Sequence, residues 1–227
     1  MKPSKNPHIS PAVETQALTR RFRGHAVLDA VDLVLPPGSV TALTGRSGAG
    51  KTTLLRLIAG LDEPDAGRIF IAGNLASEGA RAWLAPHQRG IGMVFQQAAL
   101  WPHMSVAEHL RFGLGAMPAR QAEARVAEVL GLVGIGHLAG ERPARLSGGE
   151  AARVAIARAL APAPACLLLD EPLAHLHDEL RHDIARTIRR VADTSGAAVL
   201  FVTHTPADLD GIADRAFHLE AGHLASA

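Results

Sequence analysis

The residues with the clearest chemistry lie in a glycine-rich stretch, Gly45-Arg-Ser-Gly-Ala-Gly-Lys-Thr52. The stretch follows the apolar run 40–44 and leads into the apolar segment 53–59, so it fits G-x-x-x-x-G-K-[ST] in the strand, turn and helix order that this pattern needs. Glycines let consecutive N–H groups turn inward around a polyphosphate, and a helix that begins near Gly50 adds the positive end of its dipole. We therefore predict a phosphate-binding loop rather than a chance glycine turn before a helix.

Two side chains of this loop have distinct expected roles. Lys51 would reach the β and γ phosphates of a nucleotide as a point charge, and the Thr52 hydroxyl would ligate Mg²⁺. The residues expected to contact the nucleotide are Gly45, Arg46, Ser47, Gly48, Ala49, Gly50, Lys51, Thr52 and Thr53.

Two adjacent carboxylates end a second apolar run, Cys166-Leu-Leu-Leu-Asp-Glu171. Open α/β sheets bind ligands beyond the carboxyl ends of their strands, and successive side chains leave a strand in different directions. Asp170 is then the expected partner of Mg²⁺, and Glu171 is the expected general base that polarises the attacking water. The alternative is a solvated strand end with an acidic turn.

A third motif, Leu146-Ser-Gly-Gly-Glu150, precedes the helical pattern of residues 151–160. Ser147 can cap a helix, Glu150 completes S-x-x-E, and Gly148 and Gly149 permit a ligand to approach the helix start closely. A second anion site in one chain suggests a composite site, although the motif taken alone is also that of a capped helix.

The segments around these motifs predict an α/β fold. Strands 166–170 and 198–203 flank a helix at 178–192, which is typical of a largely parallel core sheet. The further strands that we expect are 17–22, 27–35, 40–44, 68–71, 91–95 and an edge strand at 214–219, and the further helices are 50–60 and 119–133. Residues 105–133 have no strand signal.

Composition limits the class of protein. The 227 residues carry a net charge of +1, which gives no strong field for nucleic acid or an anionic membrane. The one cysteine, Cys166, lies in an apolar run and argues against a disulfide framework. The chain start has no apolar secretory segment. The longest uncharged apolar runs, 161–169 and 196–202, fall short of the roughly 20 residues that span a bilayer, so we expect any membrane role to come through a partner.

With its motifs in family order, the sequence resembles the ATP-binding cassette family, the nucleotide-binding subunits of ABC transporters, from about Leu18 to Leu224. The motifs that carry the resemblance are Walker A at 45–52, the Q-loop Gln96, the signature at 146–150, Walker B ending at Asp170, Glu171 and the switch His204. The signature separates this family from other P-loop proteins such as kinases and GTPases.

The resemblance implies a P-loop NTPase fold with a mostly parallel core sheet, an N-terminal antiparallel β subdomain and an inserted α-helical subdomain. We expect a flexible arm at residues 1–14 and a single domain at 15–227, with a core at 15–97 and 162–227 and a helical subdomain at about 98–161.

The resemblance also implies ATP and Mg²⁺ as cofactors. Ser147, Gly148 and Gly149 would contact the γ phosphate of ATP held by a second ABC subunit, so that two cassettes, expected to form a homodimer, close head to tail around two nucleotides.

Three further residues gain roles only through the resemblance. Phe22 matches the aromatic residue that stacks on adenine, and Gln96 would sense Mg²⁺ and water. His204 would contact the γ phosphate and orient the base and water. Without the resemblance, Gln96 is a strand-end amide and His204 a structural residue. Segment 98–103 would meet a membrane subunit, with Leu100 and Trp101 either a docking patch or part of the core.

The expected function is that of a Mg²⁺-dependent ATPase subunit that powers transport, with import of a small solute favoured. It would sit on the cytoplasmic face of the inner membrane through integral membrane permease subunits, with a solute-binding protein in the complete system and no nucleic acid partner. The run 93–106 resembles bacterial importers for oxyanions, metals, polyamines or thiamine, of the type without a C-terminal regulatory domain. The alternatives are a soluble non-transport ABC ATPase, or a weakly hydrolysing regulatory cassette.

One departure from the family supports a prediction. Where the family usually has Ser-Ala-Leu-Asp, this chain has Ala174-His-Leu-His177, and His177 lacks the fixed negative charge of the aspartate. We expect ATP turnover that is slower, pH-dependent or asymmetric between the two sites when compared with the variant His177→Asp. Comparing the two turnover profiles across neutral pH checks this, and identical profiles would contradict it.

Overall fold

The computed structural model describes residues 10–174, 176–205, 208 and 211–227. The expected flexible arm at 1–14 falls outside the described residues up to position 9. Its last two residues, however, belong to a sheet, because strand β1 (Val13–Phe22) begins at Val13. Val13 is fully buried, and the preceding Ala12 N–H donates to the Leu35 carbonyl at 2.9 Å. The start of the domain that we expected at residue 15 is therefore corrected to this strand.

The first sheet is antiparallel and has the strand order β2-β1-β4-β5-β6. Its remaining strands are β2 (His25–Leu35), β4 (Ala66–Ile71), β5 (Asn74–Glu78) and β6 (Arg81–Ala82). Leu18, Leu33 and Ile69 of this sheet share a buried cluster with Leu54 and Ile58 of helix α1 (Lys51–Ala59). Burying these side chains fixes α1 against the sheet.

The second sheet is mostly parallel, with the order β11-β10-β3-β9-β8-β7. Its strands are β3 (Val40–Thr44), β7 (Ile91–Val94), β8 (Cys166–Asp170), β9 (Ala198–Val202), β10 (Arg215–Glu220) and β11 (His223–Ser226). Strands β3, β8 and β9 are buried along nearly their whole length, as expected for parallel strands covered on both faces. The thiol of Cys166 in β8 is enclosed, and burial raises its pKa to about 12.

The expected edge strand at 214–219 is wrong in one respect. Strand β10 lies inside the sheet, between β3 and β11, and only β11 is antiparallel to its neighbour. The chain reverses at Ala221 and Gly222, both with positive φ (47° and 83°), and so returns along β10. The sequence showed the turn but too short a pattern for the four-residue strand after it.

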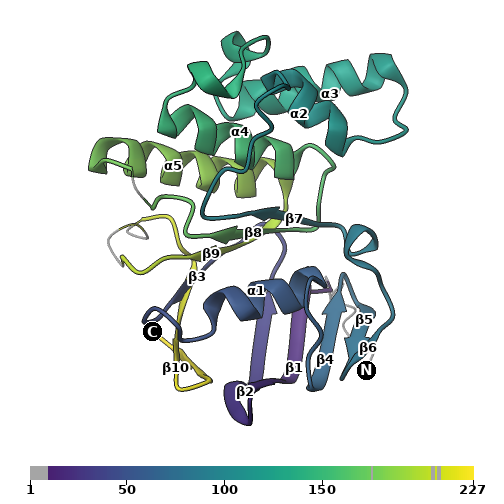
Figure 1. Cartoon of the computed structure of the whole chain (residues 1–227), viewed down its shortest axis with the longest axis vertical. Helices are drawn as coiled ribbons and strands as arrows, with labels where there is room; N and C mark the ends of the chain where they lie inside the picture. Colours follow the sequence, from purple (N-terminus) through teal and green to yellow (C-terminus); the bar gives the residue numbers. More distant parts are fainter. Residues whose placement is uncertain (1–9, 175, 206–207, 209–210) are drawn as a thin grey trace, which may run out of the picture.

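Helices form the other end of the molecule. Figure 1 shows α2 (Val106–Gly113), α3 (Ala119–Leu132) and α4 (Gly148–Leu160) gathered there, with α5 (Asp178–Ser195) between them and strands β7 to β9. Short 3₁₀ turns occur at Pro86–Gln88, Gly136–Leu138 and Pro143–Arg145. No strand falls between residues 98 and 161, a range that the structure describes in full. Among the described helices, none combines the length and the apolar character that a bilayer crossing requires.

His177 is the N-cap residue of helix α5 and has an extended backbone, but its imidazole makes no capping hydrogen bond. Helices α2 and α4, by contrast, start with complete capping boxes, Ser105 with Glu108 and Ser147 with Glu150. The N-terminus of α5 therefore relies on Asp178 and Glu179 in its first turn to complement its dipole.

Gly92 marks the tightest contact between β7 and helix α4. A Cβ atom there would lie 2.4 Å from the Ala159 carbonyl oxygen and 2.7 Å from a Leu167 methyl carbon. The main chain of the helix end thus approaches the sheet through a position that tolerates no side chain.

We expect Gly92→Ala to lower the free energy of unfolding by about 1–3 kcal/mol, because the added methyl group forces the strand and helix apart. The matched control is Gly131→Ala in α3, where no atom lies within 4 Å of the added carbon. That change should stabilise the protein by up to about 1 kcal/mol through helix propensity. Urea denaturation of both variants measures the two effects, and equal stability of the two would contradict the packing argument.

Candidate functional site

Residues 45–50 form a tight loop between β3 and α1 that requires glycine. Gly45, Gly48 and Gly50 have φ values of 148°, 80° and 105°, a region that other residues rarely adopt. A Cβ atom at Gly45 would lie 2.5 Å from the Leu219 carbonyl oxygen, and one at Gly50 would lie 2.8 Å from that of Val27. Gly50 is also the N-cap of α1, and it has no side chain to cover the first N–H groups of the helix. These groups are available to an anion.

Lys51 places its charge inside this loop. The residue is only 5% exposed, and its Nζ donates to the carbonyl oxygens of Gly45 at 2.8 Å and Arg46 at 3.0 Å. The same Nζ lies 4.0 Å from Oε1 of Glu171. The ammonium is therefore fixed at the mouth of the loop, with one carboxylate nearby.

Thr52 and Asp170 join the start of α1 to the end of β8. The Thr52 hydroxyl donates to Oδ2 of Asp170 at 2.9 Å. Burial raises the pKa of Asp170, and nearby Glu171 acts in the same direction, while the Thr52 hydrogen bond and Lys51 lower it. Hydroxyl and carboxylate oxygens are the ligands that Mg²⁺ prefers. No group of three or more metal-binding side chains occurs in the described residues, so Mg²⁺ here would need phosphate oxygens to complete its shell.

Glu171 lies between two nitrogen groups. Its Oε1 faces Lys51, and its Oε2 lies 3.4 Å from Nδ1 of His204, which follows β9. The Glu171 backbone has a φ of 49°, a strained value for a residue with a side chain, and its N–H donates to the Val202 carbonyl at 3.1 Å. The turn after β8 thus directs this carboxylate toward His204.

The turn that carries His204 is fastened to α5 by contacts that the sequence analysis missed. The Thr203 hydroxyl donates to Oδ2 of buried Asp208 at 2.8 Å, and the Thr205 N–H donates to the Thr203 hydroxyl at 3.0 Å. Arg181 of α5 donates to the Thr205 hydroxyl at 3.1 Å and pairs with Asp208, Nε to Oδ1, at 3.1 Å. Thr203 and Asp208 flank His204 in the sequence and could have been noticed. Arg181 could not, because only the fold brings α5 alongside.

Lys51, Thr52 and Glu171 line one open cleft of about 440 Å³, and Asp170 and His204 contact it through Thr52 and Glu171. Phe22, 44% exposed, stands at its rim with the Arg20 guanidinium carbon 4.8 Å from the ring centre. Of the residues expected to act on a nucleotide, the structure brings to this cleft Phe22, Ser47, Gly48, Gly50, Lys51, Thr52, Thr53, Gln96 and Glu171. Arg46 and Ala49 line a neighbouring hollow on the other side of the loop, together with Ser47 and Gly48, beside Leu219 to Gly222.

The Ser147 segment does not line the cleft. Ser147 caps α4, accepting from the Glu150 N–H at 3.3 Å and donating its hydroxyl proton to the Glu150 carboxylate at 2.8 Å. The backbone N–H of Ser147 holds the pKa of Glu150 below its ordinary value. Gly148 and Gly149 face Leu176 and Leu180, whose methyl carbons would lie 3.3 Å from an added Cβ. Within one chain, Ser147, Gly148 and Gly149 are thus separate from Lys51.

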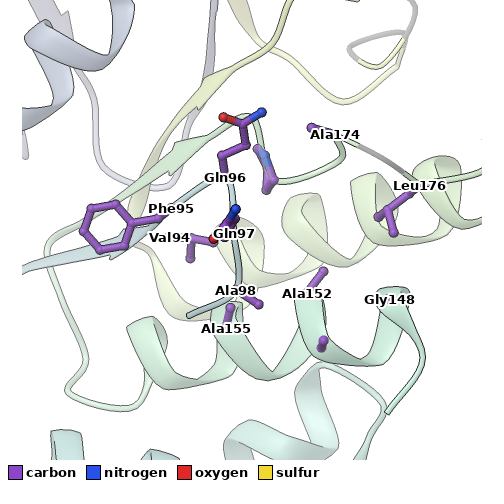
Figure 2. A pocket seen from close by; sticks show the side chains of 12 residues that line it. Val94, Phe95, Gln96, Gln97, Ala98, Gly148, Ala152, Ala155, Ala174 and Leu176 are labelled. Atoms are coloured by element: carbon purple, nitrogen blue, oxygen red, sulfur yellow. The ribbon is translucent and has the colours of Figure 1, made fainter. Parts of the chain in front are cut away.

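A second hollow of about 320 Å³ lies between the end of β7, the start of α4 and the segment after Glu171 (Figure 2). Its lining combines small side chains, among them Ala98, Ala152, Ala155 and Ala174, with larger ones such as Phe95. Gln96 lines both this hollow and the cleft. One amide side chain therefore stands between the two spaces.

Comparison with known proteins shows which family this sequence resembles. A family model described as ABC transporter matches residues 28–174. The chain is 45% identical over 199 residues to the molybdenum import ATP-binding protein ModC of Methylococcus capsulatus, covering 87% of this chain and 55% of that protein. It is 43% identical over 219 residues to the sulfate/thiosulfate import ATP-binding protein CysA of Bordetella parapertussis, covering 94% and 60%. The Fe(3+) ions import ATP-binding protein FbpC 2 of Rhodococcus jostii is 41% identical, with 94% and 61% covered.

The chain thus spans about 55% to 61% of the length of these curated relatives. A solved dimeric structure of a post-hydrolysis state of the ATP-binding cassette MJ0796, bound to ADP and Pi, aligns over 93% of this chain and 96% of its own. Its TM-score is 0.80 at 29% sequence identity. This likeness confirms the predicted P-loop NTPase fold.

The raised pKa of Asp170 gives a prediction on stability. Because its folded pKa lies above the ordinary value of 3.8, the folded state loses stability as pH rises above 3.8 and the buried carboxyl ionises. Asp170→Asn keeps an acceptor for Thr52 without the charge, so at neutral pH the nucleotide-free variant should exceed the parent by on the order of 1 kcal/mol. Urea denaturation without Mg²⁺ measures the difference, which should shrink toward pH 4. A parent that is the more stable at neutral pH would refute this account.

Proposed function

The chain belongs to the ABC transporter family, and from that premise we propose that it is the ATP-binding and ATP-hydrolysing subunit of a transporter that imports a small solute. The observation that carries the proposal is the position of Glu171 between Lys51 and His204, in the cleft that Lys51, Thr52 and Glu171 line and next to the Thr52–Asp170 pair. A phosphate-binding cation, a general base and a pair of magnesium ligands are the parts that phosphoryl transfer to water needs.

The cleft fits a magnesium nucleotide by the chemistry of its groups. The N–H groups at the start of α1 and the Lys51 ammonium would hold the phosphates, and Phe22 offers its face to the base. Thr52 and Asp170 would hold Mg²⁺, with Gln96 near them. The bound Mg²⁺ supplies neutralisation of phosphate charge.

Glu171 acts as general base in the proposed reaction. It takes a proton from the attacking water while the oxygen of that water bonds to the γ phosphorus and the bond to the leaving ADP breaks. His204 Nδ1, 3.4 Å from the carboxylate, orients it, and the Arg181–Asp208 pair holds the turn that carries His204.

A second copy of the chain would complete each site. Ser147 and the two glycines after it lie outside the cleft of their own chain, although their helix start presents N–H groups suited to a phosphate. The dimeric, ADP-bound and Pi-bound state of the related cassette supports a dimer, and we propose that it is head to tail, so that Ser147 reaches the partner's nucleotide. We propose a homodimer.

Membrane subunits would dock beside Trp101. Trp101 is 37% exposed and packs its ring 5.0 Å from that of Phe112, which is 65% exposed. Exposed aromatic rings of this kind are frequent anchors of protein interfaces. We propose that a permease binds here, at the cytoplasmic face of the inner membrane, with a solute-binding protein in the complete system. The relatives are named as import proteins for molybdenum, sulfate/thiosulfate and Fe(3+) ions, which favours an inorganic ion as cargo.

The domain layout follows the same proposal. We propose one ABC ATPase domain at residues 13–227, in which the segment of about 98–161 is a helical subdomain inserted into the core.

Glu171→Gln tests the proposed reaction, because glutamine cannot accept the proton from water. We expect turnover to fall by about 10²- to 10⁴-fold, while ATP now holds the variant as a dimer. Glu123→Gln on the exposed face of α3 is the matched control and should keep both the turnover and the monomer–dimer behaviour of the parent. Phosphate release and light scattering are the measurements. A Glu171→Gln protein with parental turnover, or one that stays monomeric with Mg·ATP, would sink the proposal.

A further inference from the structure

The loop of residues 98–104, which follows the Q-loop, is fixed to two helices by side chains. Arg158 of α4 donates Nη1 to the Ala99 carbonyl at 2.7 Å and Nη2 to the Ala98 carbonyl at 3.0 Å. Its guanidinium carbon also lies 5.4 Å from the centre of the Trp101 ring. One end of the loop is therefore held by a charge that does not titrate in the physiological range.

The middle of the loop is held by a histidine. His109 of α2 is fully buried, and its ring stacks on that of Trp101 with centroids 5.5 Å apart and planes 23° apart. Its Nε2 accepts the backbone N–H of Trp101 at 2.8 Å, and its Nδ1 lies 2.7 Å from the Ser105 carbonyl oxygen. Nε2 thus holds the loop against α2, while Nδ1 orients the ring through the N-cap residue of the same helix.

These two partners fix the tautomer. A backbone N–H can only donate and a carbonyl oxygen can only accept, so the ring carries its proton on Nδ1 and keeps a lone pair on Nε2. A second proton on Nε2 would face the Trp101 N–H with another donor. The doubly protonated ring and the hydrogen bond to Trp101 therefore exclude each other.

We propose that His109 is the positioning residue of the loop of residues 98–104 and holds Trp101 in place only while its ring is neutral. Protonation of Nε2 then releases this loop. The inference rests on the proposed function in one respect, namely that the exposed faces of Trp101 and Phe112 receive the permease. Acidification would then uncouple the ATPase from its membrane partner without touching the nucleotide cleft.

The surroundings of the His109 ring determine the direction in which its pKa is shifted. Burial lowers the pKa of His109 below the ordinary value of 6.5, and the positive charges of Arg158 on α4 and His103 in the loop act in the same direction. The Ser105 carbonyl and the carboxylate of Glu108 oppose them. Because the held form binds fewer protons than a released, solvated one, the hold is complete above pH 6.5 and weakens as pH falls below it.

The test uses Trp101 as its own reporter. The chain has two tryptophans, so Trp83→Phe leaves Trp101 as the single emitter. In that background, without nucleotide, we expect the emission to shift to longer wavelength as pH falls from 8 to 5, with a midpoint below 6.5 and unchanged far-ultraviolet circular dichroism.

Two variants separate the ring from its neighbours. His109→Asn keeps an amide that can donate to Ser105 but removes the group that titrates, so its emission should stay constant. His103→Asn removes the exposed histidine of the same loop, so a transition should remain, with its midpoint at a slightly higher pH because one opposing positive charge is gone. If His109→Asn fails to fold, His109→Gln and the proton resonances of the His109 ring in the unchanged chain give the same decision.

A parent with constant emission, a variant at position 109 that shifts like the parent, or a His109 pKa at or above 6.5 would overturn the inference. These readouts need neither ATP nor a permease. If the proposed function were wrong, ATP turnover would be absent at pH 8. That result would leave the pH dependence of the Trp101 emission unchanged.

Discussion

A lysine ammonium held inside the protein is the constraint on which the site depends. Lys51 is almost fully buried, and a buried charge is costly unless it is paired and hydrogen-bonded. The two loop carbonyls that satisfy it, those of Gly45 and Arg46, can point at Nζ only because the loop takes glycine conformations. Glu171 at 4.0 Å adds the compensating charge. The loop, the helix start and the turn after β8 are thus mutually required, and an incoming phosphate meets a cation already in place.

Much of the fold follows from local signals. The strand, loop and helix of residues 40–59 are encoded by an apolar run, three glycines and a second apolar run, all within 20 residues of one another. Strand β8 and its terminal carboxylates are equally local. By contrast, the pairing of β10 with β3 joins residues more than 170 positions apart, and Arg181 reaches Asp208 only after α5 has packed. His109 gave no signal, because a histidine on a helix face has no pattern that reveals which backbone N–H it will accept.

Helix α4 connects features that the sequence treats separately. Its first turn begins at Ser147, and Arg158, near its last turn, holds the carbonyls of Ala98 and Ala99. A helix of 13 residues is about 20 Å long and moves as a rigid body, so displacement at the loop is carried to the Ser147 end. On the α4 side, the hollow beside this helix is lined by Gly148 and three alanines, Ala151, Ala152 and Ala155 (Figure 2). Packing on that side therefore opposes a small rotation of α4 only weakly.

Gln96 borders both the nucleotide cleft and this hollow. If occupancy of one space changes the preferred rotamer of that amide, thermodynamic linkage makes the effect reciprocal: the factor by which the first occupant changes the affinity for the second is also the factor by which the second changes the affinity for the first. Such coupling between the two compartments has the same magnitude in both directions, whichever one is filled first.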